Sequence, residues 1–82
     1  MYLEEVKTLL ADVLNLGDAG QALSADSPLL GALPELDSMA VISVIAAIED
    51  RFGIVIDDDD ISARTFDTLG SLAAFVADKA QQ

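Results

Sequence analysis

The stretch that decides the fold is LDSMAVISVIAAIEDRFGIVIDDDDI, residues 36–61. Its first part predicts a helix over residues 38–52, because apolar side chains recur at spacings of three and four and Gly53 is a natural terminator. The stripe predicted to face the core comprises Val41, Val44, Ile45, Ile48 and Phe52. A second apolar strip on another side of this helix comprises Met39, Ile42 and Ala46. A helix that is apolar on two sides is either deeply buried or presents a binding surface, and in a small bundle the second reading gains weight.

The same periodicity predicts helices over residues 2–16 and 68–80. Residues 17–36 are punctuated by Gly, Pro, Ser and Asp, which predicts a long loop. We expect a short helix over residues 58–63, and an apolar loop rather than a strand over residues 53–56, because no partner strand is available. Four leucines predict that the long loop packs onto the core: Leu23, Leu29, Leu30 and Leu33. The predicted fold class is all-α, a small four-helix bundle with three longer helices, one short third helix and a long first loop.

The composition removes most catalytic chemistry. The chain has 82 residues, which predicts a single domain over residues 1–82, and it contains neither Cys nor His. A Ser-His-Asp triad, a Cys-His pair and a His/Cys zinc site are therefore impossible. A carboxylate-only enzyme or a Lys nucleophile stays conceivable, but no base stands in an identifiable site. We therefore expect a protein that is not an enzyme.

The charge restricts the partners. Fifteen acidic residues stand against four basic ones, for a formal net charge of −11. This charge repels nucleic acid and anionic membranes and favours partners with basic patches. A hydrophobic share of 52% argues against disorder. Acids at Glu4 and Glu5 do not suit a signal peptide, and no apolar run is long enough to cross a bilayer. We expect a monomeric protein in the cytoplasm.

Four consecutive aspartates, Asp57 to Asp60, raise the question of a metal site. Both frames of a calcium-binding EF-hand loop fail, because Ser62 or Ala63 stands where glycine is required. The simpler interpretation is a solvated acidic turn at the start of a short helix. We predict no metal site, although loose cation binding by these repelling charges stays open.

Ser38 has two possible roles. Ser and Asp are both favoured helix caps, so Ser38 is by pattern alone a plausible cap. Asp37 can cap equally well, however, which leaves Ser38 free to point outward. A side chain at a helix start lies beside unpaired N–H groups and the positive end of the helix dipole, where a phosphate is stabilised. Ser38 is therefore either a cap or an attachment point for an anionic group.

The quoted stretch resembles the acyl carrier protein family. The resemblance rests on the triplet Asp37-Ser38-Met39, on the segment Glu49-Asp50-Arg51-Phe52-Gly53 at the end of the helix, and on the closing segment TFDTLGSLAAFV. It extends over nearly the whole chain. The triplet is weak by itself, but with the length, helix order, long first loop and acidity it becomes specific.

The resemblance implies that a phosphopantetheinyl transferase attaches 4′-phosphopantetheine covalently to Ser38. The thiol of that arm then carries acyl groups as thioesters. Other implied partners are acyl-loading and acyl-transferring enzymes with basic or apolar docking patches. Acyl chains of this family can fold back between the helices. The family thus imports its reactive sulfur with the cofactor, which is consistent with a chain that lacks Cys and His.

This chain also departs from the family pattern. Many fatty-acid carriers have acids one turn after the serine, where Ala40, Ile42 and Ser43 stand here. The residues that we expect to contact partners are Asp37, Met39, Ile42, Ala46, Glu49, Asp50, Asp57 and Asp58. A Gly-Gly-x-Ser motif typical of peptidyl carriers is absent, which favours acyl cargo. The chain looks most like specialised stand-alone carriers, such as those of exosortase-type and polysaccharide gene clusters. The alternative is a small acidic interaction module in which Ser38 is only a helix cap.

Overall fold

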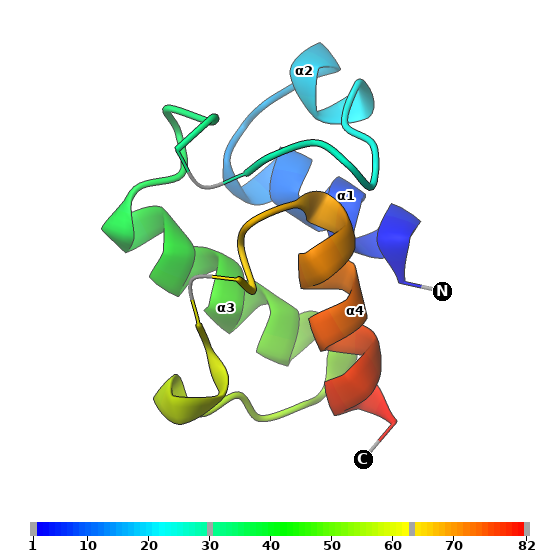
Figure 1. Cartoon of the computed structure of the whole chain (residues 1–82), viewed down its shortest axis with the longest axis vertical. Coiled ribbons are helices and arrows are strands. Elements are labelled where there is room, and N and C mark those ends of the chain that lie inside the picture. The colour runs from blue at the N-terminus through cyan, green and yellow to red at the C-terminus, as the bar shows by residue number, and fades with distance from the viewer. Residues whose placement is uncertain (1, 30, 63, 82) are drawn as a thin grey trace.

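The computed structural model describes residues 2–29, 31–62 and 64–81 and shows a small bundle of helices (Figure 1). Its elements are α1 (Leu3–Val13), α2 (Asp18–Gln21), α3 (Ser38–Phe52), the 3₁₀ turn η1 (Asp58–Asp60) and α4 (Leu69–Ala80). Within those ranges no β-strand forms, and Pro28 and Thr68 make an isolated bridge. The all-α prediction is therefore confirmed. No helix in the described part of the chain is long and apolar enough to span a membrane.

The predicted helix over residues 38–52 is confirmed with the same bounds. Helix α4 begins at Leu69, because Thr68 caps it: the Thr68 hydroxyl accepts the Ser71 N–H at 3.0 Å, and the Ser71 hydroxyl accepts the Thr68 N–H at 3.0 Å. Helix α1 is shorter than the predicted 2–16 and ends at Val13. The short third helix is a 3₁₀ turn that ends at Asp60, whereas we predicted that it would reach residue 63, which lies outside the described residues.

The prediction of an uninterrupted loop over residues 17–36 is wrong at its start, where α2 forms. Gly17 is the N-cap of α2, with a φ of 60°, rather than the terminator of α1. Helix α2 packs closely on α1, because a Cβ built at Gly20 would lie only 2.5 Å from the Ala11 Cβ. A helix of four residues is too short to be stable alone, so this contact with α1 is what supports it.

The core is one cluster of apolar side chains that α1, α3, α4 and the loops share. Eight large side chains are almost completely inaccessible: Leu10, Leu29, Ile48, Leu69, Leu72, Val6, Val44 and Val76. Helix α1 is central, because it packs against α2, α3 and α4. On α3 the core stripe is confirmed, with Val44 and Ile48 buried and Val41, Ile45 and Phe52 half-buried against the cluster.

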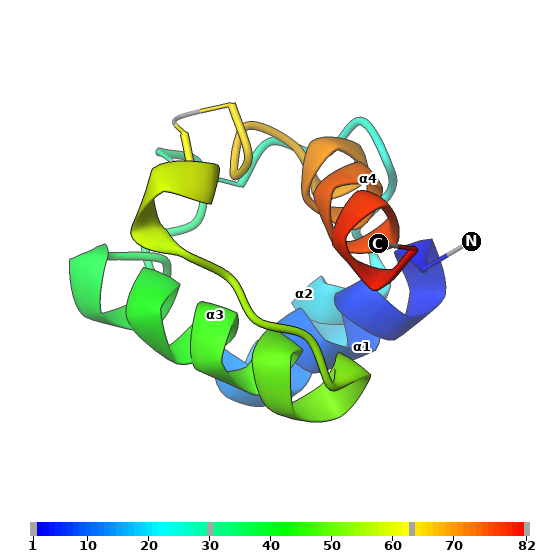
Figure 2. The ribbon, with the colours of Figure 1, turned by 90° about the horizontal axis from the view of Figure 1, so that it is seen from below.

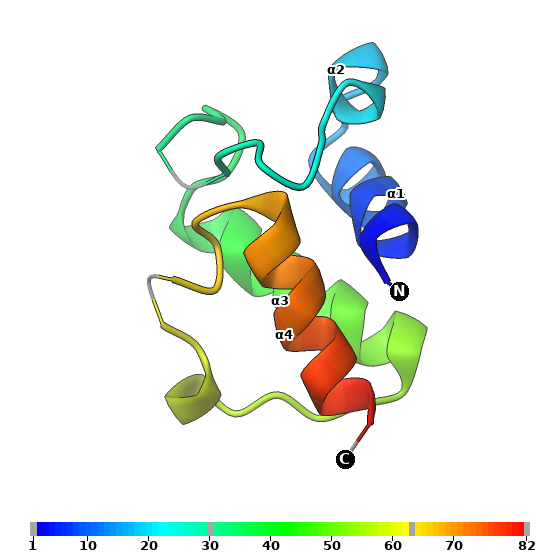
Figure 3. The ribbon, with the colours of Figure 1, turned by 45° about the vertical axis from the view of Figure 1, so that its right-hand side comes forward.

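The long first loop is tied to the start of α4 (Figure 3). The Leu29 N–H donates to the Asp67 carbonyl at 3.0 Å, the Leu69 N–H to the Ser27 carbonyl at 3.0 Å, and the Gly70 N–H to the Ala25 carbonyl at 2.8 Å. The prediction that this loop packs down is confirmed for the buried Leu29 and for the half-buried Leu23 and Leu33. Leu30 lies outside the described residues.

The segment after α3 closes the side of the molecule between α3 and α4 (Figure 2). It begins at Gly53, whose φ of 64° ends α3 in the left-handed conformation. Along this segment Ile56 and Phe66 are buried, whereas Val55 is 78% exposed. Residues 53–56 make no strand in the structure, as the sequence analysis expected.

Candidate functional site

The start of α3 is capped by Asp37, not by Ser38. The Asp37 backbone is extended, with φ −102° and ψ −173°, and its Oδ1 accepts the Ala40 N–H at 2.8 Å. The Asp37 carbonyl accepts the Val41 N–H at 2.9 Å. One residue earlier, Leu36 is 5% exposed and anchors the approach to the helix in the core. Of the two candidate caps, Asp37 is therefore the N-cap, and Ser38 is the first helical residue.

Ser38 is exposed at this end of α3. In the described part of the chain its backbone N–H and that of Met39 have no hydrogen-bond partner, as is usual in the first turn of a helix. An anion linked to the Ser38 hydroxyl would lie beside these two donors and the positive end of the helix dipole. The position therefore suits a phosphodiester in its charge, its donors and its access to solvent.

An apolar stripe lies next to Ser38 on the surface of α3. Met39 is 71% exposed and Ile42 is 61% exposed, and Ala46, one turn further, is exposed too. Met39 and Ile42 are two of the three large apolar side chains that stand out as exposed among the described residues. The first turn of α3 carries no acidic residue. The apolar face of α3, which the sequence analysis noted as a departure from the family pattern, is thus exposed at the surface.

Glu49 accepts hydrogen bonds from the segment that follows α3. It is half-buried, and its Oε2 accepts the Ile56 N–H at 2.8 Å, across seven residues. Its carbonyl accepts the Gly53 N–H, which closes the helix, and the Ile54 N–H at 3.2 Å. The sequence analysis missed this role, because the acid at this position has no distinctive spacing to the backbone N–H that it binds. Asp50 and Asp57, by contrast, are exposed.

The four aspartates do not behave as one group. Asp60 Oδ2 lies 2.8 Å from Lys79 Nζ on α4 and also accepts the Asp57 N–H at 3.1 Å. The Lys79 ammonium and the Asp57 N–H hold the pKa of Asp60 below its ordinary value of 3.8. Among the residues that the structure describes, no group of three or more acidic side chains is placed to hold a metal ion. The side chain of Asp58, which we predicted to contact partners, lies outside what the structure describes.

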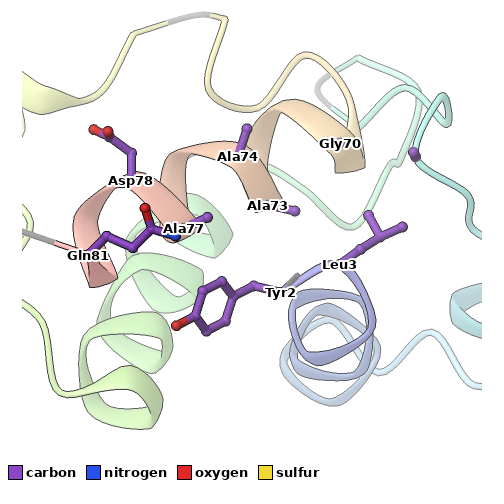
Figure 4. Close-up of a pocket in the computed structure, with 9 residues that line it drawn as sticks. Tyr2, Leu3, Gly70, Ala73, Ala74, Ala77, Asp78 and Gln81 are labelled. Atoms are coloured by element: carbon purple, nitrogen blue, oxygen red, sulfur yellow. The ribbon is translucent and has the colours of Figure 1, made fainter.

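One groove on the surface is lined mainly by small and apolar residues. It measures about 400 Å³ and runs between the start of α1 and α4, lined by Tyr2, Leu3, Ala25, Gly70, Ala73, Ala74, Ala77, Asp78 and Gln81 (Figure 4). A second groove of about 200 Å³ lies between α1 and α3. Neither groove is lined by Ser38 or Met39. Ser38 is thus an exposed residue of the surface that lies outside both of these grooves.

The chain is similar to known proteins in sequence and in fold. A family model described as a phosphopantetheine attachment site matches residues 4–76. Among solved structures, the chain is similar to the solution NMR structure of a holo acyl carrier protein from Nitrosomonas europaea, with 56% sequence identity and a TM-score of 0.93. That similarity covers 100% of this chain and 99% of the other. The chain belongs to the acyl carrier protein family. Comparison with curated proteins found no match.

Family membership defines the general activity of this acyl carrier protein. It is a carrier rather than an enzyme, and it uses covalently bound 4′-phosphopantetheine. Interaction with a phosphopantetheinyl transferase and with enzymes that handle acyl groups is part of that activity.

Proposed function

We propose that Ser38 is the residue that receives 4′-phosphopantetheine. The proposal rests on the cap of α3, because Asp37 accepts the Ala40 N–H and Ser38 stays exposed. In the transfer, the Ser38 hydroxyl oxygen forms a bond to the phosphorus nearest the pantetheine of coenzyme A. The pyrophosphate bond breaks, adenosine 3′,5′-bisphosphate leaves, and a base of the transferase takes the hydroxyl proton.

Within this proposal the chain holds and orients the arm. The free N–H groups of Ser38 and Met39 stabilise the phosphodiester at the helix start. When bound, the arm supplies the thiol that carries the acyl group as a thioester. The alternative of an interaction module in which Ser38 is only a cap loses its support, because Asp37 makes the capping bond.

We further propose that partner enzymes bind the face of α3 beside Ser38. Met39, Ile42 and Ala46 form its apolar centre, and exposed acids lie at its edges, at Asp37 before the helix and at Asp50 near its end. This arrangement fits partners with an apolar pocket that basic residues surround. Glu49 supports this face indirectly, by holding the segment after α3 through the Ile56 N–H. Contacts of partner enzymes with Asp57 and Asp58 stay predictions.

The cargo and setting are part of the same proposal. Acyl groups of fatty-acid, polyketide or related specialised metabolism fit a family member without a peptidyl-carrier motif. A single apolar cluster and a family match over residues 4–76 support one carrier domain. A formal net charge of −11 disfavours self-association and supports a monomer. Because coenzyme A supplies the arm, we place the protein in the cytoplasm.

Intact mass tests the attachment site directly. The purified protein is incubated with coenzyme A, Mg²⁺ and a phosphopantetheinyl transferase of broad specificity. A gain of one phosphopantetheine is expected for the wild type and not for Ser38→Ala. Ser43→Ala is the matched control, because Ser43 is another exposed serine on α3, and it should gain the same mass. A folded wild-type protein that gains no mass would refute the proposal.

A further inference from the structure

The groove between the start of α1 and α4 lies away from the start of α3. Helix α3 begins on the side of the molecule opposite to the N-terminus, where this groove is located (Figure 1, Figure 3). The volume of about 400 Å³ lies within the range that ligand sites in proteins have. Tyr2 and Leu3 form the wall on the α1 side. Ala73 and Ala77 point toward this wall from α4 (Figure 4).

Small residues on α4 face a fixed aromatic ring across the groove. The spacing of these small residues keeps them on one side of α4 over about two turns: Gly70, Ala73, Ala74 and Ala77. Small side chains let another backbone approach a helix closely. On the opposite wall, the ring of Tyr2 packs edge-on against Phe52 at the end of α3, with 5.3 Å between the ring centroids. The groove is therefore formed before anything binds in it.

Acidic side chains accompany each of the three segments that line the groove. One exposed acid lies among the lining residues of each segment or next to them in the chain: Asp78 on α4, Glu4 on α1 and Asp26 in the first loop. Asp78 stands in the last turn of α4, where the negative end of the helix dipole adds to its charge. The neighbouring Lys79 is paired with Asp60, and Asp78 makes no ion pair in the part of the chain that the structure describes. The groove is thus complementary to a cation.

The lining favours a helix of a partner protein over a small molecule. Small-molecule sites place a few polar groups so that they converge on the ligand, whereas the Tyr2 hydroxyl and the Asp78 carboxylate point away from each other (Figure 4). An amphipathic helix needs only an apolar groove for one of its faces and suitable charges beside it. An acidic helix, nucleic acid or a second copy of this chain, with its net charge of −11, would be repelled.

We propose that the groove between α1 and α4 is a docking site for a basic amphipathic helix of a partner protein, and that Asp78 binds one of its cations. The apolar face of that helix packs between Tyr2 and the small residues of α4. A partner held there leaves Ser38 and the face of α3 accessible, so a second enzyme can act on the arm at the same time. The proposal goes beyond the attachment at Ser38 and does not depend on it.

The probe is a synthetic amphipathic peptide of about 15 residues, which is long enough to form a helix. Leu and Ala occupy one face of it, Lys flanks that face, and aromatic residues are left out. Tyr2 is the single tyrosine of a chain without tryptophan, so the fluorescence of the protein reports directly on the groove. We expect a saturable change in this fluorescence and NMR amide shifts at Ala74, Ala77 and Asp78. Both should be the same with and without 4′-phosphopantetheine, and a peptide with Glu for each Lys should bind more weakly.

Two pairs of variants test the charge and the groove separately. Because partly exposed ion pairs contribute modestly, Asp78→Asn should raise the Kd of the Lys peptide by about two- to fivefold. Glu35→Gln is the matched control, because Glu35 is also exposed, lines neither groove and changes the net charge equally. Ala74→Lys places a cation in the groove one turn before Asp78 and should raise the Kd by about tenfold. Ala19→Lys, at an exposed alanine of α2, is its control.

The proposal is overturned if Asp78→Asn binds the peptide as tightly as Glu35→Gln does, or if peptide shifts appear at Met39 and Ile42 in place of the groove. All four substituted residues are exposed, so urea unfolding should show nearly wild-type stability. If Ala74→Lys does not fold, the Asp78→Asn pair decides.

Two other occupants give different results. Shifts at the groove that grow with protein concentration, without peptide, would indicate a second copy of the chain. Tighter binding of n-octylamine than of the peptide would indicate a small amine. Either result replaces the partner helix. A protein that gains no phosphopantetheine refutes the proposed function instead, and the titration of the apo protein still decides on the groove.

Discussion

Replacing Ile42 by Glu separates docking from folding. Ile42 lies one turn after Ser38, and 61% of it is exposed. Substitutions at exposed sites without special contacts usually change the free energy of unfolding by no more than about 0.5 kcal/mol. We therefore expect Ile42→Glu to fold with nearly wild-type stability. The same change at Val44, which is 0% exposed, would bury an unpaired charge and cost several kcal/mol.

The expected loss in partner recognition follows from the exposed area. Full burial of an isoleucine side chain contributes about 1.5–3 kcal/mol, and a partner can bury only the part that the fold leaves open. The contact is then worth about 1–2 kcal/mol, which corresponds to a loss of about 5- to 30-fold in binding or in kcat/KM. A carboxylate facing an apolar pocket adds a desolvation cost to this loss.

The assay is the kcat/KM of a phosphopantetheinyl transferase for the apo protein, with urea unfolding in parallel. Val55→Glu is the matched control, because Val55 is 78% exposed and the change in net charge is the same. Val55 lies in the segment after α3 and not in the apolar stripe beside Ser38. If both variants lose activity equally, net charge and not the α3 face is responsible. If Ile42→Glu retains wild-type kcat/KM, or loses several kcal/mol of stability, the reasoning about this face is wrong.

Three further predictions concern the segment after α3. Glu49→Ala leaves the part-buried Ile56 N–H without its acceptor and should lower the free energy of unfolding by about 1–3 kcal/mol. Glu49→Gln keeps an acceptor oxygen, so its free energy of unfolding, measured by urea titration, should fall clearly less. Gly53→Ala should lower the free energy of unfolding by about 1–2 kcal/mol through backbone strain alone, because Gly53 has a φ of 64° and a Cβ there meets nothing within 4 Å. Gly53→Asn should melt at a higher temperature than Gly53→Ala, because Asn adopts the left-handed conformation more readily. The lowered pKa of Asp60 implies that the stability from its pair with Lys79 is fully present above pH 3.8 and is lost as the pH falls through the folded-state pKa. The difference in stability between the wild type and Asp60→Asn should therefore shrink in that acidic range, and a constant difference would contradict this assignment.

Much of the candidate site could be predicted from the sequence, because its determinants are local. Helix α3 begins after Asp37 and ends before Gly53, a cap and a stop that act within a few residues of chain. The spacing placed Met39 and Ile42 outside the core stripe, and the structure shows that both are exposed. What spacing left open was which of two adjacent residues caps α3, since the pattern suits both Asp37 and Ser38.

The remaining features depend on contacts between distant residues. Helix α2 exists because Gly20 lets it approach Ala11 closely, and the first loop is held by backbone hydrogen bonds to the start of α4. Glu49 and Lys79 look like ordinary surface charges in the sequence, yet the fold turns them onto Ile56 and Asp60. The local sequence thus determined where α3 begins and which of its residues form the core stripe. Only the tertiary structure decided how the wall between α3 and α4 is closed, because that closure is made by side chains that meet across the fold.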